Sequence, residues 1–476
     1  MLNLRPAKSI QGKVELPVSP DLLFMAALGA CAASRKININ GVKSTGVVDD
    51  IIRALQSHAS IQLNGSALQV DPLSRNDPGL LLSLPESLLP YRMIYLFMGL
   101  GMGKTVTARS MPERQMHDII ARGKRIGITV ESVQVDDMAG LRSTYFDSGI
   151  AESAGINEDD CAALLAFLFG KGEKLTFSIV DYHLSTPLRQ LAHAFGFTVT
   201  AKSNTAGDAN GIIAKRMRFL QGKQRDASTQ SQIFIVDADF SRQSINTSNN
   251  SDDTKGDIST DSAVDNALDI IVPGDEVLAA ALVTLKHLIP KGDLEISNAP
   301  LETWASQTAS FIRKMGCKIN TQESAKTAFG SCGTVAVKRT ECSGRKIRCV
   351  PLYQYIGQLP CMAVAAAFVD GRESKSVFRE LGALRLFEPD GVERLEKCLR
   401  PLGVRHGEMP DGIVMEGAKD FDGFDLWDQL PAHIAVAFCM AGLKCMGKTS
   451  VADEHIVSRW PDFEVLINNI CEFRSK

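Results

Sequence analysis

The sequence repeats one local pattern, in which an amphipathic helix ends at a glycine and a short strand-like segment follows directly. Four copies span residues 116–132, 186–201, 304–320 and 392–417. A weaker copy precedes them, with Ala59 in place of the glycine. The copies are irregularly spaced, which is unlike a solenoid. They therefore predict a modular α+β chain built from α/β-type repeats.

The last copy shows what each unit contains. Its helix has apolar residues on one face, at Val392, Leu395, Leu399 and Leu402. Gly403 then supplies the left-handed residue that ends a helix. Residues 410–412, Pro-Asp-Gly, are typical of a turn between two strands. Each unit is therefore predicted to run helix, glycine, strand, turn, strand.

Length and composition predict a folded chain of two domains. At 476 residues the chain exceeds one ordinary core, and its 45% hydrophobic and 22% charged residues are typical of globular proteins. The segment 241–267 is rich in Ser, Asn and Asp and is predicted to be a disordered polar insertion. We place the first domain at 20–240 and the second at 268–476.

The net charge of −3 gives no general attraction for nucleic acid or anionic lipid. Apolar runs fall short of the roughly 18 residues of a membrane helix, and the N-terminus lacks the apolar core of a signal peptide. The 11 cysteines are scattered singly, without a C-x-x-C pair. These features predict a cytoplasmic protein with reduced thiols, no metal site and no cofactor, as a monomer or weak oligomer.

Two segments look like phosphate-binding loops. Residues 442–449 match G-x-x-x-x-G-K-T, and residues 99–105 (GLGMGKT) resemble it. A functional loop needs a strand before it and a helix after it, so that the helix N-terminus faces the phosphates. Here the order is inverted, because a helix-like segment comes first. We interpret both as helix ends followed by strands.

Several segments carry a resemblance to a known family. They are SIQGKVELP at 9–17, VPGD at 272–275, LPCMAVAAAF at 359–368, LRLFEPD at 384–390 and PDF at 461–463. On these motifs the chain resembles the enolpyruvyl transferases, and within them the 5-enolpyruvylshikimate-3-phosphate (EPSP) synthase branch. The similarity spans nearly the whole chain, with 241–267 as its main interruption.

This resemblance implies both a fold and a reaction. The fold has six β-α-β-α-β-β units in two domains around a cleft, and the strand in 1–19 joins the second domain. The reaction moves the enolpyruvyl group of phosphoenolpyruvate onto a hydroxyl of a phosphorylated cyclic substrate. A small anionic ligand of this kind would bind in the cleft, near helix N-termini whose partial positive charge favours phosphate.

The substrate-binding positions implied by the resemblance are only partly kept. The family's S-K-S loop begins at Ser19, but Pro20 and Asp21 follow, so its Lys is missing. Arg92 matches the last residue of N-A-G-T-A-x-R, and Arg114 matches the Arg of R-P. The S-S-Q loop aligns with residues 157–159, Asn-Glu-Asp, which would repel a phosphorylated ligand. Arg459 lies beside Ser458, the position of a late family Lys.

The catalytic positions are altered further. The family's Asp-Glu pair falls on residues 357–358, Gly-Gln. Of the K-E-S-D-R motif, Glu388 and Asp390 remain without their basic neighbours, and His433 replaces the Arg of D-H-R. The resemblance thus implies Glu388 and His433 as catalytic residues, and Ser19, Arg92, Arg114, Asp390 and Arg459 as substrate-binding residues.

Three hypotheses remain open. At about 1.5–3 kcal/mol for each lost charge-assisted hydrogen bond, losing four or so would abolish useful affinity for the usual substrates. We therefore favour an EPSP synthase-like protein that does not catalyse ordinary enolpyruvyl transfer. The alternatives are a divergent carboxyvinyl transferase with another acceptor, in which Glu388 is the base and His433 carries a proton, and an interaction role in a larger shikimate-pathway assembly. Ordinary structural roles, as helix caps or solvated charges, compete for each surviving residue.

Overall fold

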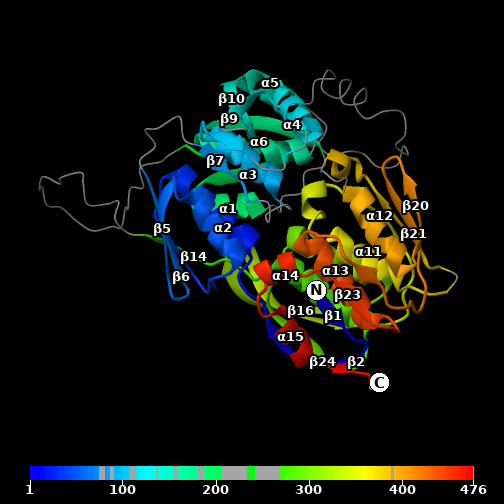
Figure 1. Ribbon diagram of the computed structural model, residues 1–476. Coiled ribbons are helices and arrows are strands. Elements are labelled where there is room, and N and C mark those ends of the chain that lie inside the picture. The colour runs from blue at the N-terminus through cyan, green and yellow to red at the C-terminus, as the bar shows by residue number, and fades with distance from the viewer. Residues whose placement is uncertain are drawn as a thin grey trace, which may run out of the picture.

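The computed structural model describes residues 1–73, 81–85, 91–107, 111, 113–135, 138–153, 158–180, 187–204, 233–241, 267–371, 373–386 and 391–474. Its buried apolar side chains form two separate hydrophobic cores. Figure 1 shows the two groups of helices and strands that carry them, blue to cyan in one and mainly yellow to red in the other. The first core runs from Leu22 to Val272 and includes a few later residues. The second core combines residues 2–16 with residues 277–471. The predicted insertion lies almost entirely outside the described residues, at 242–266.

Three small sheets surround the first core, each with three or four strands. The strand orders are β14-β4-β6-β5, β7-β8-β10-β9 and β11-β13-β12. The strands are β4 (Ile37–Asn40), β5 (Ala59–Asn64), β6 (Ala67–Pro72), β7 (Leu81–Ser83), β8 (Thr105–Thr107), β9 (Ile128–Val135), β10 (Met138–Phe146), β11 (Lys174–Val180), β12 (Thr198–Asn204), β13 (Ile233–Asp239) and β14 (Leu268–Ile270). The first strand after residue 267, β14, pairs in parallel with β4 and so lies with the first core.

The sheets around the second core follow a similar plan. Their strand orders are β16-β17-β15-β3, β18-β19-β21-β20 and β1-β23-β22, with a further pair β2-β24. The strands are β1 (Leu2–Leu4), β2 (Ala7–Ile10), β3 (Gly12–Glu15), β15 (Leu294–Pro300), β16 (Lys318–Thr327), β17 (Gly330–Lys338), β18 (Lys346–Arg348), β19 (Lys375–Arg379), β20 (Arg405–Met409), β21 (Gly412–Glu416), β22 (Asp425–Leu426), β23 (Thr449–Val451) and β24 (Cys471–Phe473). The chain therefore begins and ends in the sheets of the second core.

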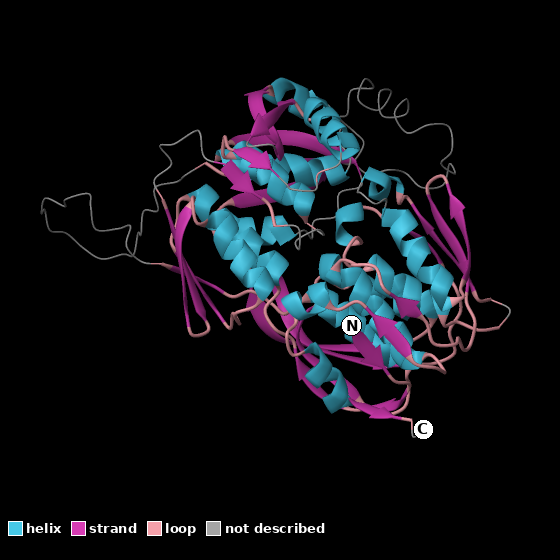
Figure 2. Cartoon of the chain, in the orientation of Figure 1, coloured by secondary structure: helices cyan, strands magenta, loops and turns pink. Residues whose placement is uncertain are grey.

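Within the described residues, six inner helices fill the two cores, and Figure 2 shows sheets on their outer sides. They are α1 (Pro20–Ala33), α3 (Arg92–Gly101) and α6 (Glu158–Lys171) in the first core, and α9 (Glu276–Leu288), α11 (Leu359–Ala367) and α13 (Ala432–Lys444) in the second. The three helices of each core contact one another. Every residue of α9 is buried, and α1 is buried from Pro20 to Ala32. Helices that are apolar on all sides are expected at such positions.

The outer helices end as the repeats predict. They are α4 (Glu113–Arg125), α7 (Pro187–Ala194), α10 (Gln307–Met315) and α12 (Gly391–Leu402). A glycine with positive φ follows each of them, at 81° in Gly127, 83° in Gly196, 129° in Gly316 and 85° in Gly403. A strand then begins within two residues. These are left-handed positions that favour glycine.

The smaller helical segments complete the described fold. They are α2 (Gly46–Leu55), α5 (Ser148–Ser153), α14 (Glu454–Arg459), α15 (Phe463–Ile470), η1 (Thr303–Ala305), η2 (Leu352–Gln354) and η3 (Gly382–Leu386). Residues 442–449 join the end of α13 to β23, and residues 99–105 join α3 to β8. The interpretation of both as helix ends followed by strands is therefore confirmed. In the described part of the chain, no helix has the length and apolar character needed to cross a membrane.

The chain passes twice between the cores, along two segments that lie side by side. One crossing segment is 16–19, which leads from β3 into α1, and the other is 272–275, which leads from β14 into α9. The Ser19 N–H donates to the Pro273 carbonyl at 3.0 Å, and the Asp275 N–H donates to the Pro17 carbonyl at 2.8 Å. An isolated bridge pairs Val18 with Gly274. Helices α1 and α9 therefore begin next to each other.

Candidate functional site between the two cores

A buried arginine joins the starts of α1 and α9. The Arg459 side chain, at the end of α14, is only 2% exposed. Its Nη2 donates to Asp21 Oδ2 at 2.6 Å and its Nε donates to Asp275 Oδ2 at 2.9 Å. Trp460 Nε1 donates to the same Asp275 oxygen at 3.0 Å. The two carboxylates belong to opposite cores, so this guanidinium links the crossing segments and is already neutralised.

The N-termini of both helices are met by the chain's own oxygen atoms. Asp275 caps α9, because its Oδ1 accepts from the N–H groups of Val277 at 2.9 Å and Leu278 at 3.1 Å. Ser19 caps α1, where its Oγ accepts from the Leu22 N–H at 3.3 Å. Free N–H groups and the positive end of the helix dipole attract anions. The N–H groups of Leu22, Val277 and Leu278 are thus satisfied internally, and Ser19, a predicted substrate-binding residue, is a helix cap.

A third carboxyl group lies in the same cluster. Glu276, the first residue of α9, is 2% exposed, and neither of its oxygens has a hydrogen-bond partner within the described residues. Burial, with the neighbouring Asp21 and Asp275 carboxylates, raises the pKa of Glu276 to about 8, and Arg459 and Ser19 offset only part of this. Burial also raises the pKa of Asp21. The cluster of Asp21, Asp275, Glu276 and Arg459, which we call the carboxylate cluster, therefore holds three carboxyl groups and one guanidinium, and Glu276 is largely protonated at neutral pH.

Aromatic side chains cover this cluster. The Tyr95 hydroxyl donates to the Asp21 carbonyl at 2.8 Å. Tyr91 packs edge-on against Trp304, with ring centroids 6.4 Å apart. Trp304 is fully buried, and its Nε1 donates to Gln190 Oε1 at 2.9 Å. Trp304 lies in η1, after the second crossing, yet it packs into the first core. The two parts of the chain are therefore in direct side-chain contact here.

His433 is a neutral group in this structure. It is the second residue of α13 and is 7% exposed. Burial lowers the pKa of its imidazole to about 3, and the positive charges of Arg459 and Arg394 add to the effect. At neutral pH this ring therefore carries no charge. It does not replace the positive charge of the arginine that the resemblance places there.

The other predicted arginines have contrasting environments. Arg92, the first residue of α3, is 4% exposed, directly after Tyr91. Arg114 is exposed on the first turn of α4. A solvated charge at such a position interacts weakly with its surroundings. Arg92 is thus the buried candidate of the pair, and Arg114 is an exposed surface charge in this structure.

Helix α6 also begins with acidic residues that the chain itself neutralises. Asp160 Oδ1 accepts from Arg122 Nη1 at 2.9 Å, and Arg125 donates to both Asp160 oxygens at 3.0 Å. Burial raises the pKa of Asp159 to about 6, against the opposing effects of Arg122 and the Leu352 N–H. The sequence predicts repulsive acidic residues at 157–159. It does not reveal that Asp160 pairs with Arg122 and Arg125, because these arginines lie 38 and 35 residues away in the chain.

A neutral amide network stands where the resemblance places a catalytic carboxylate. Gln358 Oε1, at the start of α11, accepts from the Thr308 N–H at 3.0 Å. Gln307 Nε2 donates to Gln354 Oε1 at 3.1 Å beside it. All four residues are buried, and they join α10 to α11. The remaining predicted residues, Glu388 and Asp390, lie outside the described part of the chain.

Comparisons with known proteins agree with this architecture. A family model for EPSP synthase (3-phosphoshikimate 1-carboxyvinyltransferase) matches residues 244–466. A 3-phosphoshikimate 1-carboxyvinyltransferase of Desulfitobacterium hafniense is 28% identical over 205 residues, which are 43% of this chain and 46% of that protein. The same enzyme of Desulforudis audaxviator is 25% identical over 203 residues, 42% of this chain and 47% of that protein. The match thus spans about half the length of these curated relatives.

Solved structures resemble the whole chain. EPSP synthase from Acinetobacter baumannii has a TM-score of 0.60 with 15% identity, covering 98% of both chains. An enolpyruvyl transferase from Streptomyces tendae has a TM-score of 0.57 with 13% identity, covering 99% of this chain and 98% of the other. At this identity the likeness concerns the fold. The predicted fold class is confirmed.

Proposed function

We propose that this chain is a member of the enolpyruvyl transferase family, similar to EPSP synthase. We propose further that it is an EPSP synthase-like protein whose anion site is occupied by its own carboxylates. In this proposal it does not transfer the enolpyruvyl group of phosphoenolpyruvate to shikimate 3-phosphate. The observation that carries the proposal is the double ion pair of Arg459 with Asp21 and Asp275 at the starts of α1 and α9.

Electrostatic repulsion opposes the binding of a phosphate at the carboxylate cluster. A phosphate placed at these helix N-termini would meet Asp21, Asp275 and Glu276 within one buried cluster that contains one guanidinium. Two like charges about 4 Å apart repel by about 4 kcal/mol at an effective dielectric constant near 20. Displacing a carboxylate from Arg459 would instead leave that carboxylate buried without its cation, at a cost of about 3–5 kcal/mol. Either route opposes the binding of a highly negative donor beside a phosphorylated acceptor.

The titratable groups near the cluster are also poorly suited to proton transfer. General acid–base catalysis needs groups whose pKa lies near the working pH. His433 has a pKa of about 3, and Gln358 is a neutral amide held by the Thr308 N–H. The pKa of Glu276, about 8, lies near neutral pH, but this carboxyl group is buried in the cluster that the aromatic side chains cover. These environments favour a structural role for the carboxylate cluster.

The test is a direct comparison with an active relative. We expect no saturable phosphate release when the full chain is mixed with phosphoenolpyruvate and shikimate 3-phosphate, under conditions in which the Acinetobacter baumannii enzyme turns over. We also expect no heat of binding with phosphoenolpyruvate in calorimetry, and no rescue of a strain that lacks EPSP synthase. Saturable phosphate release would refute the proposal. Release that appears only with a different acceptor would favour a divergent transferase.

A charge-removal variant tests the electrostatic reason. The double substitution Asp21→Asn and Glu276→Gln removes two carboxylates from the cluster and keeps the shapes of the side chains. We expect it to bind inorganic phosphate more tightly than the wild type does. The matched control, Asp425→Asn with Glu454→Gln, makes the same two kinds of substitution at exposed positions. If both double variants bind phosphate equally, the carboxylate cluster is not what excludes the anion.

A further inference from the structure

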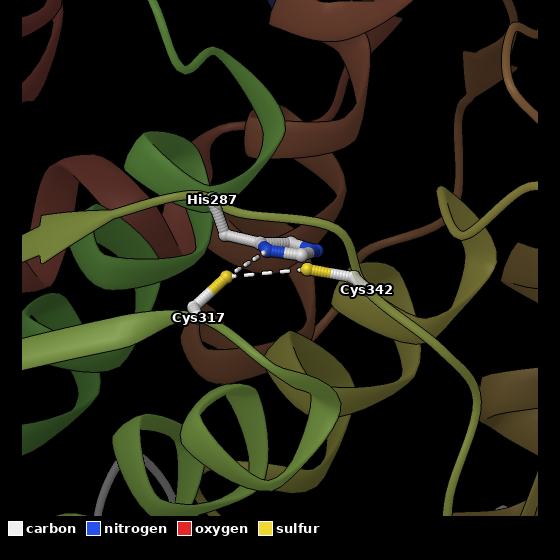
Figure 3. Close-up of side chains that lie close together, drawn as sticks. All are labelled: His287, Cys317 and Cys342. Carbon is white, nitrogen blue, oxygen red and sulfur yellow. Dashed lines mark hydrogen bonds between the residues drawn. The ribbon is translucent and has the colours of Figure 1, made fainter.

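Three soft ligand residues meet inside the second core, well apart in sequence (Figure 3). His287 lies in the last turn of α9, Cys317 follows the glycine that ends α10, and Cys342 lies in the loop between β17 and β18. The two sulfur atoms of Cys317 and Cys342 are 3.4 Å apart, and His287 Nδ1 is 3.3 Å from Cys317 Sγ. All three ligand atoms lie within 4.8 Å of one another.

The imidazole is oriented so that one nitrogen faces the sulfur atoms. His287 Nε2 lies 3.3 Å from the Ala365 carbonyl oxygen on α11. A carbonyl only accepts hydrogen bonds, so Nε2 carries the proton and Nδ1 presents its lone pair toward Cys317. Metal-binding histidines generally have their second nitrogen held in this way, which fixes both the tautomer and the ring orientation. The His287 ring is therefore prepared to act as a ligand through Nδ1.

The loop that carries Cys342 is tied to the same helices. Arg339 donates from Nη1 to the His287 carbonyl at 3.1 Å and from Nη2 to the Phe368 carbonyl at 3.2 Å. The Thr340 hydroxyl donates to the Gly316 carbonyl at 2.6 Å, and the Ser343 N–H donates to the Met315 carbonyl at 2.9 Å. Cys342 is thus held beside the end of α10 from both directions, which keeps its sulfur close to Cys317.

We propose that His287, Cys317 and Cys342 form a binding site for a thiophilic metal ion, with zinc as the expected occupant. Zinc–sulfur bonds of about 2.3 Å and zinc–nitrogen bonds of about 2.0–2.1 Å, in a tetrahedral arrangement, separate two sulfurs by about 3.8 Å and a sulfur and a nitrogen by about 3.6 Å. The observed separations of 3.4 and 3.3 Å are a few tenths of an ångström shorter. Small side-chain shifts therefore accommodate the ion.

The donor set also indicates which ions are suited. Two cysteine sulfurs and an imidazole favour zinc or monovalent copper over magnesium and calcium, which prefer oxygen ligands. His287 and Cys317 are buried, while Cys342 is half-buried, so the fourth position is on the solvent side. Three protein ligands with a solvent ligand is a known zinc arrangement. The site lies in the second core, and its existence does not depend on whether the carboxylate cluster excludes phosphoenolpyruvate.

The test uses the reduced full-length protein after removal of metal with a chelator. Zinc affinity is measured by competition with a chromophoric chelator, and Co²⁺ is added as a spectroscopic probe. We expect one zinc ion per chain, and a cobalt spectrum with a thiolate charge-transfer band and intense visible bands of tetrahedral coordination. Changing an outer-sphere partner costs roughly 10–100-fold in affinity. His287→Gln, Cys317→Ser and Cys342→Ser, which remove a ligand, should each weaken zinc binding by more than about 100-fold.

Cys398→Ser provides the matched control, because Cys398 is another buried thiol of the same core outside the proposed site. It should retain the affinity and the cobalt spectrum of the wild type. The tryptophan fluorescence of each variant checks that it remains folded. The proposal is overturned if the reduced wild type binds zinc no more tightly than Cys342→Ser, or if its cobalt spectrum lacks the thiolate band. It is also overturned if the reduced protein binds no zinc and mild oxidation forms a Cys317–Cys342 disulfide instead.

Discussion

Replacing Arg459 with methionine isolates the contribution of the carboxylate cluster. The substitution keeps a long side chain and removes the two hydrogen bonds, of 2.6 Å to Asp21 and 2.9 Å to Asp275. It leaves the three buried carboxyl groups of the carboxylate cluster, including that of Glu276, without the positive charge of Arg459. Removing one partner of a buried ion pair costs about 3–5 kcal/mol. We therefore expect Arg459→Met to lower the free energy of unfolding by about that amount at neutral pH.

The pH dependence of this loss has a definite sign. Without Arg459, the pKa values of Asp21 and Glu276, already raised by burial, rise further. The folded variant then holds protons that the unfolded chain releases, so its stability falls as pH rises. The destabilisation should be smallest near about pH 5 and largest near about pH 8, because protonated carboxyls no longer need a cation.

Urea unfolding monitored by tryptophan fluorescence measures this loss. The chain has 3 tryptophans, and Trp460 contacts Asp275 directly. Arg125→Met is the matched control, because Arg125 also pairs with an aspartate but its side chain is 49% exposed. Asp160 is buried but keeps Arg122 as a second partner, so loss of the half-exposed Arg125 should cost only about 0–1 kcal/mol. The reasoning is refuted if Arg459→Met costs less than about 1 kcal/mol, or if its cost is the same at both pH values.

Three further predictions concern individual residues. Because the pKa of Glu276 is raised to about 8, the free energy of unfolding of the wild type should fall as pH rises from about 4.5 to 8. Glu276→Gln should remove this pH dependence and stabilise the protein at pH 8 by on the order of a few kcal/mol, measured as the shift in the urea midpoint. Because the pKa of His433 is lowered to about 3, the stabilisation that its neutral ring gives the folded protein should be lost as pH falls from about 6.5 toward 3. The proton resonances of this imidazole should not titrate near neutral pH. Gly274→Ala would bring a Cβ within 2.5 Å of the Asn298 carbonyl oxygen and of Leu16 Cβ, in the second crossing segment. It should destabilise the protein by about 1–3 kcal/mol, measured by thermal unfolding. Gly382→Ala, where the added Cβ meets open space, should leave the stability unchanged.

The sequence predicted those parts of the fold that are encoded locally. The helix before Gly403 and the turn at 410–412 each depend on a few consecutive residues, so the pattern was visible without a structure. The inner helices are buried on all sides and show no amphipathic period. Of these helices, only α3 and α13 were predicted without the family resemblance, from the helix ends at 99–105 and 442–449. The pairing of β1–β3 with late strands is non-local, and it was likewise implied by the resemblance.

The candidate site was predicted less completely, for the same physical reason. Arg459 was expected to face an anionic ligand, but its partners Asp21 and Asp275 are 438 and 184 residues away in the sequence. No local pattern reveals such a contact. No metal site is predicted from the sequence because the chain has no C-x-x-C pair. That spacing reveals only ligands that lie close together in the sequence. Cys317 and Cys342 lie on two different elements, and the fold brings them together with His287.

The pairing of the earliest strands with the latest ones sets the order in which the chain can fold during synthesis. Strand β2 pairs with β24, and β1 pairs with β23. Ala7 therefore cannot pair with Phe473 until nearly the whole chain has been synthesised. Translation at about 5–20 residues per second separates their emergence from the ribosome by roughly 25–90 s. The first core can assemble in that interval, while β1 and β2 remain without their partners. The second core is therefore completed only at the end of synthesis, and slowing translation late in the message should prolong the exposure of these strands to chaperones.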